Sequence, residues 1–213
     1  MAARMISVFI LESRVMNLTT KAMRGIIFST ESVQAILEGR KSQTRREVKE
    51  TPDCEIMAYN GRWICNIRTA ADDYSTHYIK PRYQVGEIVY VKETWTKTMV
   101  RDEEGWFYVY KADGDDWAAP FKSPLFMPQS AARIFIQITD VRVERLGDIS
   151  EEDAIAEGLK DPFDYQLPDF YEQYDLQINQ CAYIGLWQSI NKSYNPDTWV
   201  WAYSFKRIYK LNN

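Results

Sequence analysis

The stretch Gly39-Arg40-Lys41-Ser42-Gln43-Thr44-Arg45-Arg46 is the most informative part of this sequence. It holds four basic residues and three polar ones in eight positions, and it directly follows the segment 35–38. Two interpretations are open from the residues alone. One is a solvated basic turn, which is the usual fate of a short run of charge. The other is an anion or nucleotide site, in which arginine side chains bind phosphate through two parallel hydrogen bonds.

The residues before this stretch predict a strand followed by a helix. Residues 24–28 predict the strand, and Ser29 or Thr30 is suited to cap the helix that follows. Apolar residues within 33–37 recur at helical spacing and form one apolar face. Gly39 is expected to end the helix, because glycine readily adopts the left-handed conformation found there. We therefore expect the basic stretch to form a polar turn just beyond a helix C-terminus.

The rest of the chain predicts several short strands and few helices. A short helix is expected to start after Ser150 and to end at Gly158, and a longer one to lie within residues 169–190. Strands do not alternate regularly with helices, so the pattern indicates an α+β fold built on a small β-barrel with flanking helices. The predicted strands cover residues 62–67, 87–95, 106–111, 133–143 and 199–209.

One domain is expected over residues 23–213. Residues 1–22 contain three methionines, and Met23 follows directly, so translation has several candidate starts within this region. The apolar run in it is too short for a convincing signal peptide. We expect residues 1–22 to be an extension outside the core; the alternative is a short strand or helix that docks on the domain.

Composition limits the classes of function. The formal net charge is -4, so contact with nucleic acid has to come from a local basic patch rather than from the whole molecule. No apolar run approaches the roughly 20 residues that span a bilayer, so no membrane partner is expected. Cys54, Cys65 and Cys181 are scattered and odd in number, which favours a reducing cytoplasm over a secreted disulfide framework.

Metal or cofactor binding is not expected from the sequence. His77 is the only histidine, and with three scattered cysteines it does not supply the paired spacing of a zinc site. Its neighbours are polar, so we interpret it as a surface histidine in a loop. Trp95, Trp106, Trp199 and Trp201 are candidates for base stacking, but aromatic residues in strands usually pack in cores. We assign all four to packing first and take Trp95 as the candidate exception for binding, because it lies beside Glu93 near the end of a predicted strand.

The stretch Gly39 to Arg46 resembles the G-x-K-x-x-T-x-R signature of the ASCH domain. Three further blocks resemble parts of the same family and follow in the family's order: residues 85–95, 140–158 and 199–205. The chain is similar to the larger ASCH proteins that are often found in phages and prophages. The resemblance implies a PUA-like β-barrel, a fold associated with RNA binding. Residues 50–80, 96–130 and 160–195 would then be insertions.

One bacterial branch that this chain resembles at the signature removes the acetyl group from acetylcytidine. The resemblance implies catalytic roles for Lys41, Thr44 and Glu157. A lysine whose pKa is lowered by burial would activate the threonine hydroxyl, and the glutamate would pass a proton to the leaving amine without a metal. The residues expected to bind substrate or RNA are Arg40, Arg45, Arg46, Glu93 and Trp95.

The resemblance leaves several functions open. Other ASCH proteins are ribonucleases, so metal-dependent RNA hydrolysis is an alternative to an amidohydrolase. A non-catalytic module that binds RNA or a modified base is a second alternative. A phage morphogenetic accessory protein is a third. For the amidohydrolase, the ribonuclease and the binding module, the expected partner is RNA, a nucleoside or a nucleotide.

Overall fold

The computed structural model describes residues 22–49, 54–60, 62–68, 74–99, 105–114, 120–162, 165 and 176–208. The chain divides into two compact units. Unit 1 takes the chain up to Glu38, the segment Gly86–Gln137, and the residues from Lys206 on. Unit 2 takes Gly39–Val85 and Ile138–Phe205. Apart from residue 22, the expected N-terminal extension lies outside the described residues, and the single domain over 23–213 stays a prediction.

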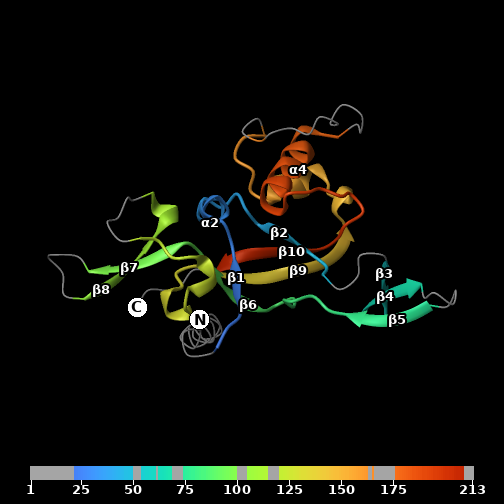
Figure 1. Ribbon diagram of the computed structural model, residues 1–213, viewed down its shortest axis with the longest axis horizontal. Coiled ribbons are helices and arrows are strands. Elements are labelled where there is room, and N and C mark those ends of the chain that lie inside the picture. Colours follow the sequence, from blue (N-terminus) through green and yellow to red (C-terminus); the bar gives the residue numbers. More distant parts are fainter. Residues whose placement is uncertain are drawn as a thin grey trace, which may run out of the picture. The chain divides into compact units, whose positions relative to one another are not determined.

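Unit 1 contains short strands, one helix and three turns of 3-10 helix (Figure 1). Strand β1 runs parallel to β6, and β6 pairs antiparallel with the start of β9. Strands β7 and β8 form a separate antiparallel hairpin. The elements are β1 (Gly25–Ile27), α2 (Thr30–Leu37), β6 (Ile88–Lys92), β7 (Trp95–Met99), β8 (Trp106–Tyr110), η1 (Lys111–Asp113), η2 (Pro124–Phe126), η3 (Gln129–Ala131) and β9 (Phe135–Arg145), which continues into unit 2.

Unit 2 places two helices beside a sheet that contains β9, β10 and β2 (Figure 1). Strand β10 pairs antiparallel with β2, and β3, β4 and β5 form a second sheet in that order. The elements are β2 (Gln43–Glu47), β3 (Glu55–Tyr59), β4 (Arg62–Arg68), β5 (Tyr74–Ile79), η4 (Leu146–Asp148), α3 (Glu151–Ala156), α4 (Ile178–Asn191) and β10 (Trp199–Ile208).

The α+β class is confirmed, but the described strands form three open sheets and no closed barrel. Local signals fixed the first elements as expected. Ser29 caps α2 by accepting a hydrogen bond from the N–H of Ser32 at 3.2 Å. Gly39 follows the helix with φ +79°, where a side chain would be strained. The strand expected over 87–95 is divided into β6 and β7, with Glu93 between them.

Two loop predictions were wrong. The basic stretch after Gly39 is not a polar turn, because residues 43–47 form β2 and pair with β10. His77 lies in strand β5 rather than in a loop, although its side chain is exposed as expected. In both cases strand pairing supplies backbone hydrogen bonds that polar composition alone does not reveal.

Cys54 and Cys65 form a disulfide. Cys54 directly precedes β3, and Cys65 lies in β4, so the β3–β4 hairpin brings two positions that are 11 residues apart into contact. The sequence spacing did not indicate this pair, and the cytoplasmic location stays a prediction. Cys181 is buried in α4. Among the helices that the structure describes, none is both long and apolar enough to cross a membrane.

A buried ion-pair cluster as the candidate functional site

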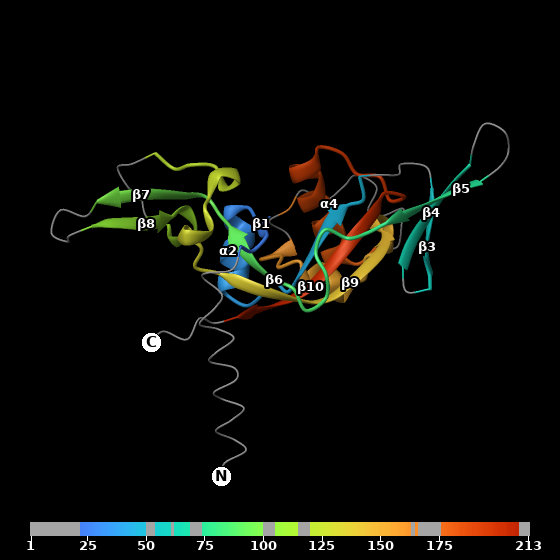
Figure 2. The same ribbon diagram turned by 90° about the horizontal axis from the view of Figure 1, so that it is seen from below.

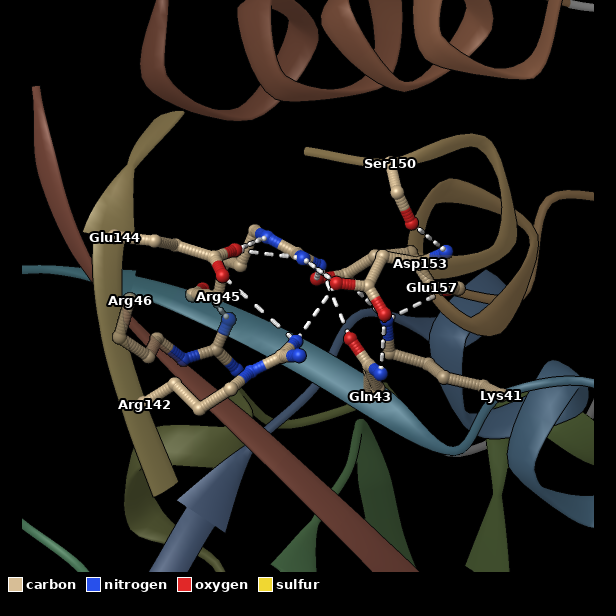
Figure 3. Close-up of polar contacts among 9 residues, drawn as sticks. All are labelled: Lys41, Gln43, Arg45, Arg46, Arg142, Glu144, Ser150, Asp153 and Glu157. Atoms are coloured by element: carbon tan, nitrogen blue, oxygen red, sulfur yellow. Dashed lines mark hydrogen bonds and ion pairs between the residues drawn. The ribbon is translucent and has the colours of Figure 1, made fainter. Parts of the chain in front are cut away.

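The chain is extended where it leaves Gly39, and this brings it against the end of α3. Lys41 forms an isolated antiparallel bridge with Glu157, and the N–H of Ser42 donates to the carbonyl of Ala156 at 2.9 Å. Side chains alternate between the two faces of an extended chain. Lys41, Gln43 and Arg45 therefore point to one side of the β2 segment, toward α3 (Figure 3).

Helix α3 presents two carboxylates to that side. Ser150 caps the helix by accepting a hydrogen bond from the N–H of Asp153 at 3.2 Å, as the sequence predicted. Asp153 and Glu157 are four residues apart, so they lie on one face of the helical turn. Gly158 follows with φ 86° and ends the helix. A capped helix of six residues thus holds both acids at a fixed place beside β2.

Arg45 is the centre of the cluster, and its side chain is 0% exposed. Its guanidinium contacts Glu144 at 2.7 Å, Asp153 at 2.8 Å and Glu157 at 3.2 Å. Tyr183 of α4 lies beside the same guanidinium, and the distance from the Tyr183 ring centroid to the Arg45 Cζ is 5.7 Å. Burial tends to lower the pKa of Arg45, but the three carboxylates outweigh it and raise that pKa. Arg45 is therefore a permanent buried cation held by three acids.

Lys41 and Glu157 form the second part of the cluster. The Lys41 Nζ donates to Glu157 Oε2 and to the Glu157 backbone carbonyl, each at 2.6 Å. Both residues are 5% exposed. Burial lowers the pKa of Lys41, and this outweighs the opposing effect of the Glu157 carboxylate. The other oxygen of Glu157 accepts from Arg45, so Glu157 keeps a cation beside it when Lys41 loses its proton.

A polar rim completes the cluster around Asp153. Gln43 Nε2 donates to Asp153 Oδ1 at 2.7 Å, and Arg142 Nη2 donates to Asp153 Oδ2 at 2.7 Å. Burial tends to raise the pKa of Asp153, but these hydrogen bonds and the charge of Arg45 together lower it. Four residues of this cluster were not predicted from the sequence as site residues: Gln43, Arg142, Glu144 and Asp153. The four-residue spacing of Asp153 and Glu157 on a capped helix was the one available signal.

The structure brings Lys41, Arg45 and Glu157 together but places Thr44 elsewhere. Thr44 is 1% exposed and lies opposite Tyr203 of β10, on the face of β2 that points away from Arg45. Arg46 is exposed and shares that face, and its Nη1 donates to the Arg45 carbonyl at 3.2 Å. Arg40 is half-buried and donates to the carbonyls of residues 158 and 159.

Glu93 and Trp95 lie in unit 1, and both are buried there. Glu93 is buried and accepts two hydrogen bonds from Arg133, at 2.8 and 3.0 Å. Burial raises the pKa of Glu93 despite Arg133. Trp95 is buried with Tyr110 in a small core cluster, so it packs rather than presenting a free ring face. The binding roles assigned to both residues stay predictions.

Replacement of Lys41 by methionine should test the burial of its charge. A lowered pKa means that the folded state binds fewer protons than the unfolded state at pH values between the lowered pKa and about 10.4. In that window the free energy of unfolding of the wild type rises with pH, because the unfolded chain takes up the extra proton. We expect Lys41→Met to remove this rise and to stay within about 1 kcal/mol of the wild type near pH 7.

Urea unfolding curves of both proteins between pH 7 and pH 10 measure this difference. Comparison with the variant cancels the contribution of tyrosines that titrate in the same range. Equal pH slopes in the two proteins would mean that Lys41 has an ordinary pKa in the folded state. A lysine in a solvated polar turn would also give a small effect near pH 7, but it would give no difference in slope.

No group of three or more histidine, cysteine, aspartate or glutamate side chains in the described part of the chain is arranged to hold a metal ion. The acids of the cluster instead accept hydrogen bonds from Lys41, Arg45, Gln43 and Arg142. The absence of a cofactor stays a prediction.

No protein-family model matches this chain, and no curated protein matches it. Among solved structures, the chain is similar to a crystal structure of a protein from Enterococcus faecalis V583 of family-model DUF984. The TM-score is 0.34 and the identity 14%, over 82% of this chain and 65% of that chain. The chain thus spans less than two thirds of that protein's length. Similarity at this level supports no inference about activity.

Proposed function

We propose that this protein is an ASCH-type, PUA-like protein that binds RNA or a nucleotide, and that its Lys41–Glu157 pair is a metal-independent amidohydrolase centre for an acylated pyrimidine nucleoside. The observation that carries the proposal is the 2.6 Å contact between Lys41 Nζ and Glu157 Oε2, which joins buried groups 116 positions apart. The resemblance at residues 39–46 supplies the class of substrate. We also propose that the protein is of phage or prophage origin and is located in the cytoplasm.

The pair has the properties of a proton-transfer couple. A lysine with a lowered pKa has a larger neutral fraction near pH 7 than a solvated lysine, and only the neutral amine accepts a proton. Glu157 lies within hydrogen-bond distance of that amine. Arg45 compensates the charge of Glu157 throughout, so movement of one proton between Lys41 and Glu157 leaves no carboxylate without a cation.

Water is the nucleophile that fits this arrangement better than Thr44, since Thr44 lies on the other face of β2. Lys41 would take a proton from water as the water oxygen bonds to the acyl carbon. The C–N bond then breaks, and Glu157 passes the proton from Lys41 to the leaving nitrogen. The products are a carboxylic acid and the free amine of the base, so the atoms and protons balance. Thr44 has a structural role when water is the nucleophile.

Turnover of acetylcytidine by the full chain tests the proposal. We expect Lys41→Met and Glu157→Gln each to lower kcat by at least about 100-fold, because each removes one partner of the proton transfer. Thr44→Val retains the shape of the side chain and should keep most of the activity. Chelator should leave turnover unchanged. Free cytidine and acetate, separated by chromatography, are the products to quantify.

Lys80→Met is the matched control, since Lys80 is an exposed lysine of the same unit outside the cluster. Turnover that survives Lys41→Met would reject the proposed base. Loss of turnover in Thr44→Val with a normal urea unfolding curve would restore Thr44 as the nucleophile. RNA cleavage that stops on addition of chelator would favour the metal-dependent ribonuclease instead.

A non-catalytic role is the second candidate, and the charge balance of the cluster favours it. Three cations, Lys41, Arg45 and Arg142, face the carboxylates of Glu144, Asp153 and Glu157. Such a balanced network can fix α3 against β2 without any chemistry. Absence of turnover on both acetylcytidine and RNA, together with RNA binding, would select the binding module. Absence of binding as well would select the morphogenetic accessory protein.

A further inference from the structure

The β7–β8 hairpin of unit 1 gathers aromatic side chains on one of its faces. The register opposes Trp95 to Tyr110, Lys97 to Tyr108 and Met99 to Trp106. Directly opposed residues of two antiparallel strands, and alternate residues along each strand, share a face. The face therefore carries four rings, which we call the aromatic ladder: Trp95, Tyr110, Tyr108 and Trp106. Figure 2 shows the two strands extended side by side.

A cation lies over every ring of the aromatic ladder. The Lys97 Nζ is 5.4 Å from the centroid of Trp106 and 5.9 Å from that of Tyr108. The Lys122 Nζ is 5.3 Å from the Trp95 centroid. Arg133 lies 3.9 Å from the centroid of Tyr110, and Glu93 and Asp113 neutralise it. Lys97 and Lys122, in contrast, form no ion pair with an acid among the residues described.

The aromatic ladder has a buried end and an exposed end. Trp95 and Tyr110 are buried with Met127 and Ala131, and the Tyr110 hydroxyl donates to the Ala131 carbonyl at 2.6 Å. Trp106 is 60% exposed, Met99 61%, and Lys97 is exposed as well. Tyr108 lies between Trp106 and Tyr110 along the face and is half-buried. Its ring centroid is 5.7 Å from that of Trp95. The exposed rings therefore extend from a part of the hairpin that is packed in a core cluster.

We propose that the exposed end of the aromatic ladder, Trp106 and Tyr108 with Lys97, binds single-stranded RNA by stacking on its bases. This surface is in unit 1, whereas the Lys41–Glu157 pair is in unit 2. The proposal rests on the RNA-binding part of the proposed function, and it specifies which surface binds single-stranded RNA. An exposed tryptophan and a tyrosine beside a lysine that has no ion pair among the described residues supply both the stacking and the charge that such strands require.

The spacing of the rings suits a base. Alternate side chains on a strand are about 7 Å apart, which is twice the roughly 3.4 Å separation of stacked bases. We infer that one base enters between Trp106 and Tyr108, where the Lys97 Nζ now lies 5.4 and 5.9 Å from the two ring centroids. Lys97 would move to the neighbouring phosphate when the base enters. Lys122, over Trp95, is the next cation along the same face.

A binding titration with a labelled ten-nucleotide adenine RNA tests the proposal on the full chain by fluorescence anisotropy. We expect Trp106→Ala to weaken binding about tenfold and Trp106→Phe to recover most of the loss, because phenylalanine still offers a ring. Lys97→Gln should weaken binding and reduce the slope of log affinity against log salt by about 0.7, which corresponds to one phosphate contact on a single strand.

Two matched controls are present in the same unit. Lys111→Gln removes an equal charge from an exposed lysine that contacts no ring among the described residues, and Phe126→Ala removes a ring that is 72% exposed outside the aromatic ladder. Both should bind within about twofold of the wild type. A duplex of the same sequence should bind more weakly than the single strand, because its bases are already stacked and paired.

Unchanged affinity in Trp106→Ala while the wild type binds RNA would overturn the aromatic-ladder proposal and leave RNA binding intact. Equal affinity for duplex and single strand would overturn it as well. No binding by the wild type would reject both this surface and the RNA-binding part of the proposed function. Turnover of free acetylcytidine would still test the catalytic role of the Lys41–Glu157 pair independently. Loss of self-association in Trp106→Ala, without RNA binding, would assign the surface to protein contact instead.

Discussion

Arg45→Met is expected to lower the free energy of unfolding by about 3–5 kcal/mol, the largest effect of any charge substitution in unit 2. Methionine fills a similar length of side chain, so loss of packing is small. The cost arises because Glu144, Asp153 and Glu157 lose their shared cation while Glu157 stays almost fully buried. Removal of one member of a buried network leaves charges that water cannot reach.

Urea unfolding followed by circular dichroism measures this loss. Arg46→Met is the matched control, because Arg46 is the next residue in the same strand and is exposed. Its effect should stay within about 0.5 kcal/mol. Lys41→Met should also be mild, since burial already works against the charge of Lys41. Similar losses in Arg45→Met and Arg46→Met would show that the three carboxylates do not depend on Arg45.

A second large effect is expected at the disulfide of the β3–β4 hairpin. Cys65→Ala should lower the free energy of unfolding by about 2–3 kcal/mol, because the bond closes a short loop and so restricts the unfolded chain. The sequence separation of the two cysteines is 11 residues. Reducing agent should destabilise the wild type by a similar amount and leave Cys65→Ala unaffected.

Alkylation of the unreduced protein in denaturant, followed by mass measurement, gives a direct check. One added group is expected, on Cys181, because the other two cysteines are bonded to each other. Without denaturant Cys181 should react slowly, since it is buried and burial raises the pKa of its thiol. Three added groups without reduction would show that Cys54 and Cys65 are free thiols in solution, as a reducing cytoplasm would favour.

Local chemistry made part of this molecule predictable from the sequence alone. Ser29 and Ser150 cap helices because a hydroxyl next to a helical segment satisfies a backbone N–H that the helix leaves unpaired. Gly39 and Gly158 end those helices with positive φ, which costs glycine little. Alternating apolar residues predicted β9, and the aromatic run 199–209 predicted β10. Each of these signals acts within a few residues.

The candidate site was predictable only in part. The resemblance to the ASCH family selected Lys41 within residues 39–46 and Glu157 within residues 140–158, and the structure places them in contact across 116 positions. Thr44 was selected by the same resemblance, yet strand alternation turns it to the opposite face. Glu93 was expected to bind substrate or RNA; it is buried in unit 1, where its partner is Arg133.

What only the tertiary structure decided is which charges are buried together. Residues 41–46 read as a solvated basic turn because nothing in their local sequence shows that β10 will pair with them. That pairing, and the packing of α3 and α4 on the Lys41 side, remove water from Lys41 and Arg45 and supply Glu144, Asp153 and Glu157 as their counter-charges. Desolvation depends on neighbours far away in the sequence, so the lowered pKa of Lys41 is a property of the folded chain and not of its signature.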